Sequence, residues 1–341
     1  MTCLLLALAL LQPARPDAAA LSEQATRLSQ AKQYAEAERL WLKALAIDSR
    51  FFPAAFNLGF QHFSRHEWAK AETYLRKAAT LEPNDFNSRY LLGLAMVNQD
   101  RREAGLREWQ EALRINPRHT KLMLVMAVEY GKGHYFREAA AVARRAVELN
   151  PADQNAYFVA LKACQDAQDP AGLDLAKVAA ERFPDSARAN FEYGFHLQRA
   201  GLPEQALPYL RKAMSLDTSY EEPFFFHGEI LAREDKHEEA VQSLRKALAI
   251  RPDYVPASMV LAKSLMTLER FDEARQELAR IIAASPEHPQ PHLLLSQIYY
   301  RLGDEERARA EKSISMKLRR ANPSLMEAPQ AVPFPKEPQS R

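Results

Sequence analysis

The sequence predicts an all-α protein, a solenoid of about nine helix–turn–helix repeats of about 34 residues each. Three observations predict it: a small residue recurs every 34 residues, a second small residue follows seven positions later, and a proline often follows twelve positions later. The first of these positions holds Ala37, Ala71, Gly105, Ala139, Gly172, Ala206, Ala240, Ala274 and Ala308, with a single gap of 33. Since one hairpin cannot bury its apolar face alone, neighbouring hairpins must stack into a continuous core.

The first half of each repeat predicts a helix that approaches its partner closely. Gly59 follows a leucine, and Gly93 lies at the equivalent place one repeat later. Antiparallel helices come close only where side chains are small, so we expect Gly59 and Gly93 to contact Ala71 and Gly105 of the second helices. The prolines that follow the second helices mark their ends; they are Pro83, Pro117, Pro151, Pro184, Pro252 and Pro286.

This pattern resembles the tetratricopeptide repeat (TPR), a 34-residue helix pair with small residues at these positions and a proline near its end. The resemblance covers about residues 18–322, nearly the whole chain. It implies a right-handed α-solenoid whose first helices line a concave groove. It also implies binding and scaffolding of other proteins, without catalysis.

The fifth repeat, residues 153–186, departs from the pattern because it is one residue short and its second helix is rich in alanine. Fewer large side chains bury less apolar area. We therefore expect this repeat to be the softest joint, with a local change of superhelix pitch. Pro170 lies where it can start the second helix of this repeat.

Both ends of the chain are expected to lie outside the solenoid. Residues 1–20 form an apolar leader in which Leu4 to Leu11 is too short to span a bilayer, and Ala18 to Ala20 are typical of a signal-peptide cleavage site. We expect an exported protein, periplasmic or secreted; a cytoplasmic protein with an N-terminal capping helix is the alternative. Residues 323–341 are rich in proline and show no helical period, which predicts a disordered basic tail.

Charge and cysteine content narrow the function classes. The 46 lysines and arginines nearly balance the 44 aspartates and glutamates, whereas nucleic-acid-binding domains are typically strongly basic. Cys3 and Cys164 cannot form a disulfide framework or a four-cysteine zinc site. His62 and His66 have metal-ligand spacing, but no third ligand lies nearby in sequence. Without a phosphate loop or a nucleophile motif, we predict a non-enzymatic protein with no cofactor and no metal.

The groove implied by the resemblance is predicted to be rich in aromatic rings. Its first inner position, four residues before the second, carries Phe56, Tyr90, Tyr157, Phe191 and Phe225; the second carries Phe60 and Phe195, and a third adds Phe63. Aromatic rings give a large contact area at low entropic cost, which suits an apolar or extended polypeptide. Arg188, Arg199 and Arg233 lie on or beside this face and can pair with a partner's carboxylates. Packing against the next hairpin is the alternative for each ring.

The predicted function is a protein–protein interaction scaffold or adaptor that binds a partner segment in the concave groove. One alternative is a helical-repeat RNA-binding protein, which would need a basic inner track that the chain upstream of the tail does not provide. Another is the recognition subunit of an enzyme complex whose catalytic chain is separate. A third is self-association, in which the groove of one copy takes the tail of another.

Overall fold

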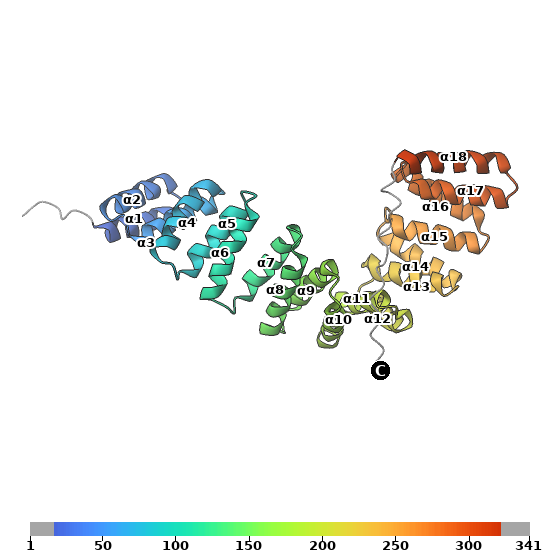
Figure 1. Cartoon of the computed structure of the whole chain (residues 1–341), viewed down its shortest axis with the longest axis horizontal. Coiled ribbons are helices and arrows are strands. Elements are labelled where there is room, and N and C mark those ends of the chain that lie inside the picture. The colour runs from blue at the N-terminus through green and yellow to red at the C-terminus, as the bar shows by residue number, and fades with distance from the viewer. Residues whose placement is uncertain (1–16, 322–341) are drawn as a thin grey trace, which may run out of the picture. The chain divides into compact units, whose positions relative to one another are not determined.

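The structure, a computed structural model, describes residues 17–321, and every regular element in this range is an α-helix (Figure 1). The helices form nine pairs in chain order, with the period that the sequence predicts, so the predicted all-α repeat solenoid is confirmed. The helices are α1 (Ala18–Gln30), α2 (Tyr34–Ile47), α3 (Phe52–Ser64), α4 (Trp68–Leu81), α5 (Phe86–Val97), α6 (Arg102–Ile115), α7 (Thr120–Lys132), α8 (Phe136–Leu149), α9 (Gln154–Ala167), α10 (Ala171–Arg182), α11 (Ala187–Arg199), α12 (Pro203–Leu216), α13 (Glu221–Arg233), α14 (His237–Ile250), α15 (Val255–Thr267), α16 (Phe271–Ala284), α17 (Pro289–Arg301) and α18 (Glu305–Ala321).

The chain divides into two compact units, Met1–Asp169 and Pro170–Arg341. The boundary falls in the turn of the shortened fifth repeat, so unit 1 holds α1–α9 and unit 2 holds α10–α18. Within each unit, every helix packs against the next helix along the chain. Each unit therefore has the stacked arrangement that lets neighbouring hairpins share one core.

Small residues bring the two helices of a repeat together, as the sequence predicts. A Cβ atom added to Gly93 of α5 would lie 2.3 Å from Nε1 of Trp109, and one added to Gly105 of α6 would lie 2.6 Å from the carbonyl oxygen of Gly93. Trp109 is fully buried and its indole N–H donates to the carbonyl of Tyr90 at 3.0 Å. The backbones at this contact are thus so close that only glycine fits at either position.

Each turn between the two helices of a repeat contains one residue in the left-handed backbone region. These residues are Lys32, His66, Asp100, His134, Gln168, Gly201, Asp235, Glu269 and Gly303. In all nine turns the next residue donates its N–H to the carbonyl five positions back, at 2.8 to 3.0 Å, which is the bond of the Schellman motif. Seven of the nine are not glycine, and the left-handed conformation costs each of these about 1 kcal/mol. The turns therefore cannot be recognised in the sequence by a glycine, because only two of the nine left-handed residues are glycine.

The fifth repeat has the short second helix that its sequence indicates. Helix α10 has 12 residues, whereas α8 and α12 on either side have 14. Its buried residues are all small: Gly172, Ala176, Ala179 and Ala180. Pro170 directly precedes it with a φ of −61°, so its predicted place at a helix start is confirmed. The expected softness and change of pitch stay predictions.

The two predicted end segments lie largely outside the described residues. This holds for residues 1–16 of the leader and for residues 323–341 of the predicted tail. Ala18 to Ala20 form the first turn of α1, where Asp17 caps the helix by accepting the N–H of Ala20 at 2.7 Å, and Ala18 is buried. Cleavage after Ala20 would remove this cap, and export stays a prediction. No helix between residues 17 and 321 is long and apolar enough to cross a membrane.

We predict that Gly93→Ala lowers the free energy of unfolding by about 3 kcal/mol, because the new methyl group must displace a buried indole and a backbone carbonyl. Urea unfolding followed by circular dichroism measures this change. Gly131→Ala in α7 is the control, since nothing lies within 4 Å of its added Cβ. The control should leave stability unchanged or raise it by about 0.5 kcal/mol. Equal effects of the two substitutions would contradict the close-contact account.

Candidate protein-binding surface

The first helices of the repeats lie on the inner side of each unit. In unit 1, α1 contacts α3, α3 contacts α5, and α7 contacts α9; in unit 2, α11, α13, α15 and α17 contact one another in succession. Among the described helices, no pair of second helices from successive repeats packs together to this extent. A stack of hairpins whose first helices are closer together must curve toward them. The first helices therefore line the concave side, where the sequence places the candidate groove.

Three of the predicted groove rings are buried. Tyr157, Phe191 and Phe225 are only 2%, 7% and 7% exposed. Phe191 lies with its ring centroid 5.1 Å from that of Tyr220 and 5.6 Å from that of Phe226, both from the next repeat. All three rings are buried, and for Phe191 and Phe225 aromatic rings of the following repeat pack against them. For them the packing alternative holds.

An aromatic ladder on α3, made of Phe52, Phe56 and Phe60, ends in an exposed ring. Neighbouring rings stack with centroids 5.8 and 6.4 Å apart. Phe56 is half-buried, whereas Phe60 is 50% exposed. Val128 of α7, at the same inner position as Phe60, is 46% exposed. The second inner position thus presents open apolar surface in unit 1.

The remaining predicted rings are intermediate between core and surface. Phe63 and Tyr90 in unit 1 and Phe195 in unit 2 are each partly buried. Phe63 packs edge-on against Trp68, with centroids 5.3 Å apart, and Phe195 stacks on the buried Phe191 at 6.0 Å. Each of these rings supports the fold with one side and leaves part of its area accessible.

The three predicted arginines already have partners within the chain. Arg233 donates to Glu229 at 2.8 Å, and the same carboxylate accepts a hydrogen bond from Gln198 at 2.8 Å. The Arg199 guanidinium lies 5.7 Å from the centroid of the Phe195 ring. Arg188 is 3.7 Å from Glu192. A partner carboxylate would have to compete with these contacts, which makes the three arginines weaker anchors than their positions suggest.

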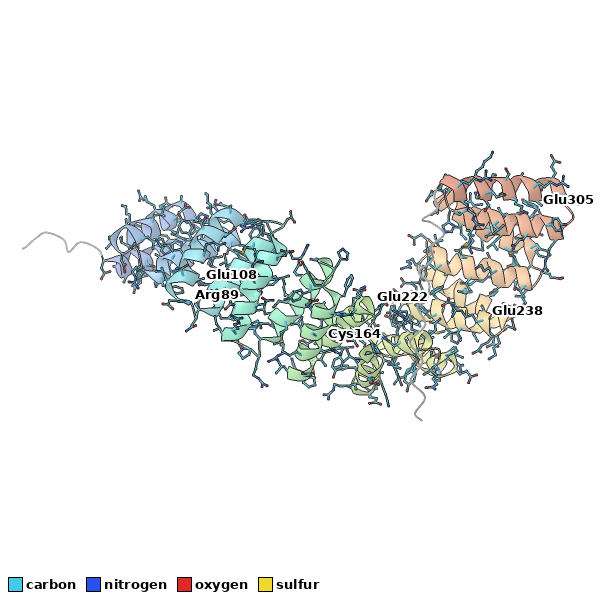
Figure 2. The ribbon with its side chains drawn as sticks, viewed as in Figure 1. Arg89, Glu108, Cys164, Glu222, Glu238 and Glu305 are labelled. Carbon is cyan, nitrogen blue, oxygen red and sulfur yellow. The ribbon has the colours of Figure 1, made fainter. Side chains whose placement is uncertain are left out.

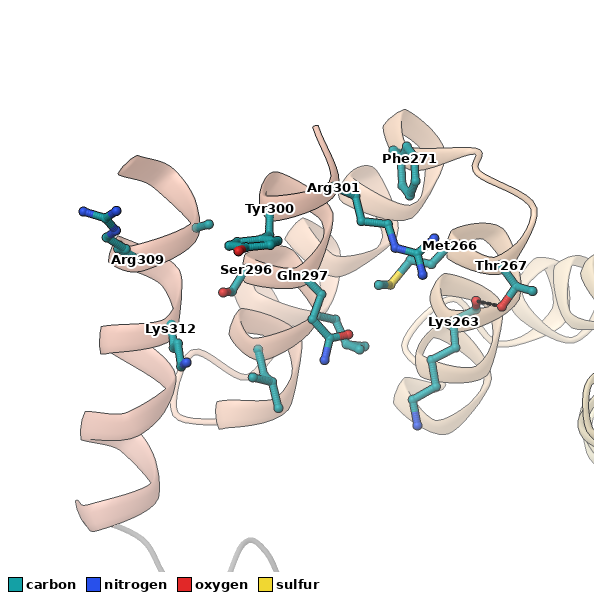
Figure 3. Close-up of a pocket in the computed structure, with 13 residues that line it drawn as sticks. Lys263, Met266, Thr267, Phe271, Ser296, Gln297, Tyr300, Arg301, Arg309 and Lys312 are labelled. Carbon is teal, nitrogen blue, oxygen red and sulfur yellow. Dashed lines mark hydrogen bonds between the residues drawn. The ribbon is translucent and has the colours of Figure 1, made fainter. Parts of the chain in front are cut away.

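Two clefts include residues of the first helices in their lining. In unit 1 a cleft of about 630 Å³ lies between α1 and α3 and has a largely polar lining that includes Ser22, Thr26 and Asn57. In unit 2 a larger cleft of about 980 Å³ is formed by α15, α16, α17 and α18 (Figure 3). We call the second one the C-terminal cleft. Its lining residues are Lys263, Met266, Thr267, Phe271, Leu293, Leu294, Ser296, Gln297, Tyr300, Arg301, Ala308, Arg309 and Lys312.

Sequence reasoning did not select the C-terminal cleft, although it lies at the expected inner positions. The second inner position changes from Phe60 and Phe195 to Lys263 and Gln297, and the third becomes Tyr300. Because the groove was predicted from aromatic rings, these polar positions were not selected. The informative signal was this loss of apolar character in the last two repeats.

The ionisable side chains outside the clefts have structural roles. His62 is fully buried and its Nδ1 lies 2.9 Å from Glu67, and this hydrogen bond lowers the pKa of that carboxyl group. Arg89 and Glu108 form an ion pair of 3.0 Å between α5 and α6 (Figure 2). Burial raises the pKa of the Cys164 thiol to about 11, so it is protonated and unreactive at neutral pH. Between residues 17 and 321 no three His, Cys, Asp or Glu residues gather as a metal site would require.

Comparison with known proteins identifies the repeat. The sequence model of the tetratricopeptide repeat family matches residues 231–298, which span α14 to α16 and most of α17. The same helix pair recurs with the same turn geometry along the described chain. The matched segment is similar to tetratricopeptide repeats, and the other described helix pairs repeat its architecture. The resemblance on which the groove was placed is thereby confirmed, and the TPR fold accounts for the two-helix unit.

The curated relatives of this chain are distant. Anaphase-promoting complex subunit 3 of Schizosaccharomyces pombe is 25% identical over 188 residues, covering 54% of this chain and 28% of the relative. The E3 ubiquitin-protein ligase CHIP of Arabidopsis thaliana is 27% identical over 134 residues, 38% of this chain and 48% of the relative. The chain thus spans less than half of either protein. The crystal structure of PilW, a type IV pilus biogenesis factor, superposes with a TM-score of 0.52 at 24% identity, covering 60% of this chain and 94% of PilW.

We predict that His196 of α11, next to Phe195, makes stability depend on pH. Burial, with a contribution from Arg199, lowers its pKa to about 4, so the unfolded chain takes up this proton near pH 6.5 and the folded chain does not. Stability should therefore fall as the pH drops from 6.5 toward 4, by about 2 kcal/mol at pH 5 from this residue. Urea unfolding of His196→Gln should show a correspondingly weaker loss between pH 7.5 and pH 5. Parallel pH profiles of the two proteins would refute this assignment.

Proposed function

We propose that this TPR protein is a non-enzymatic scaffold that binds a segment of a partner polypeptide on the concave face of its first helices. The observation that carries the proposal is the exposed apolar surface at the second inner position, where Phe60 is 50% and Val128 is 46% exposed. Half-exposed rings that stack into a ladder provide contact area whose geometry is already fixed. Binding to such a surface costs little ordering entropy.

The chemistry of unit 1 supports a polypeptide as the ligand. The ladder of Phe52, Phe56 and Phe60 presents apolar area without a neighbouring cation at the same inner position, which in α1 holds Thr26 and in α5 holds Leu94. Apolar contact suits aliphatic or aromatic side chains of a partner, and rings of this kind are frequent hot spots of protein interfaces. The name of one relative, a subunit of the anaphase-promoting complex, is in keeping with a component of a larger assembly.

The double variant Phe60→Ala/Val128→Ala tests the proposal. Crosslinking and affinity capture from the cells that naturally produce the protein, read by quantitative mass spectrometry, should recover at least one protein with the wild type. The variant should recover it about tenfold less, since two exposed side chains contribute roughly 1.5 kcal/mol of contact.

Leu42→Ala/Ile47→Ala on α2 is the matched control. These side chains are 41% and 57% exposed, also in unit 1, but they lie on a second helix. Circular dichroism should show that both variants keep their helices. The proposal fails if the control loses the partner and the inner-face variant keeps it.

A further inference from the structure

We propose that the C-terminal cleft binds a short acidic peptide segment that carries an apolar side chain. This inference rests on the proposed function, because it assigns a ligand chemistry to one part of the concave face. It concerns unit 2 alone, where α15, α16, α17 and α18 supply the lining side chains (Figure 3).

The C-terminal cleft has an excess of positive charge that is not paired within the described chain. Three cations of the lining come from three different helices: Lys263 from α15, Arg301 from α17 and Lys312 from α18. No aspartate or glutamate is among the lining residues, and within residues 17–321 none of these three cations forms an ion pair. They differ in this from the three arginines of the predicted groove, whose charges are engaged by neighbours. Three cations around an open cleft favour a ligand with carboxylates.

The fourth cation of the lining, Arg309, has a different role. It forms an ion pair with Glu305 one turn earlier on α18, and in Figure 3 its side chain extends away from α17. Lys312, on the next turn, is drawn on the side of α18 that faces α17. The net charge available to a ligand therefore comes from the three unpaired cations.

Part of the cleft lining is apolar and can contact an apolar side chain of the ligand. Met266, Phe271 and Leu293 are partly buried, and Tyr300 is 71% exposed, the largest exposed fraction of any large apolar or aromatic side chain in the described chain. A phenol ring this open can cover a ligand's aliphatic or aromatic side chain. A volume of about 980 Å³ suits a few residues of peptide, since ligand clefts typically enclose roughly 300–1,000 Å³.

The short extent of the basic region favours a peptide over a single-stranded nucleic acid as the ligand. A nucleic-acid strand needs a basic track that follows its phosphates over several repeats. Here the basic region does not continue into the preceding repeat, because the residue equivalent to Lys263 there is Glu229. Acidic groups confined to a short segment match the small basic region, and an apolar side chain matches the Met266 and Phe271 surface.

Selection from a library of random dodecapeptides on the full-length protein tests the inference. Peptides enriched by the wild type should be acidic and should carry at least one large apolar residue. Their affinity should fall roughly tenfold or more in Lys263→Gln/Arg301→Gln/Lys312→Gln, and high salt should weaken wild-type binding in the same direction.

The matched control removes three other exposed cations of unit 2, in Arg182→Gln/Arg211→Gln/Lys212→Gln on the second helices α10 and α12. It has the same net charge as the cleft variant and should bind the selected peptides like the wild type. Thermal unfolding by circular dichroism should show both variants folded.

Three results would overturn the inference: no acidic bias among the enriched peptides, equal binding by the wild type and the cleft variant, or tighter cleft-dependent binding of a thymidine dodecanucleotide than of any selected peptide. The proposed function is tested separately. If the host partner still depends on Phe60 and Val128 while acidic peptides ignore the cleft, only this inference fails. If acidic peptides need the cleft but no host protein depends on the inner face of unit 1, the proposed use of unit 1 fails and this inference stands.

Discussion

The close contact between the two helices of each repeat is the constraint on which the rest of the structure depends. At Gly93 and Gly105 the backbones approach until any side chain would collide, and a Cβ atom added to Gly59, Gly194 or Gly228 would lie within about 3 Å of a leucine of the second helix. This contact uses one face of each helix. A second face must pack against the neighbouring hairpins, since a hairpin alone leaves it exposed. On the first helices this leaves the inner side, where Phe60 and Val128 are exposed.

The inner sides of the two units differ in chemistry, although their backbones repeat the same motif. In unit 1 the second inner position holds Thr26 in α1 and apolar residues in the later repeats, of which Phe60 and Val128 are exposed. In unit 2 the same position becomes Glu229, Lys263 and Gln297 in the last three repeats. Because the TPR scaffold holds every first helix in the same way, this change in side chains alters what can bind without altering the fold.

The repeat architecture could be predicted from the sequence because it depends on residue size at regular spacing. Glycine at positions 93 and 105 is required by the short distance between the two helices. The turns could be placed by spacing but not by residue type. Their left-handed residue is held by the Schellman hydrogen bond and is glycine only at Gly201 and Gly303.

The candidate site was predictable only in part, since exposure depends on the neighbouring repeat. Phe56 and Phe191 occupy equivalent positions, yet Tyr220 and Phe226 cover Phe191, whereas Phe56 keeps part of its surface accessible. Ion pairing also cannot be predicted from the residues at one repeat position alone, because it depends on which side chains lie nearby. Arg233 is engaged by Glu229 four positions earlier on its own helix, while Lys263 has no such partner.

Site-specific photocrosslinking tests most directly whether the inner side of the first helices is the binding surface. A photoreactive phenylalanine analogue would be placed at position 60 of α3 and, in a second protein, at position 47 of α2, both of which are about half exposed. The account predicts that, in the cells that naturally produce the protein, position 60 crosslinks to a discrete partner and position 47 does not. Crosslinks from position 47 with none from position 60 would contradict it and would move the interface to the second helices.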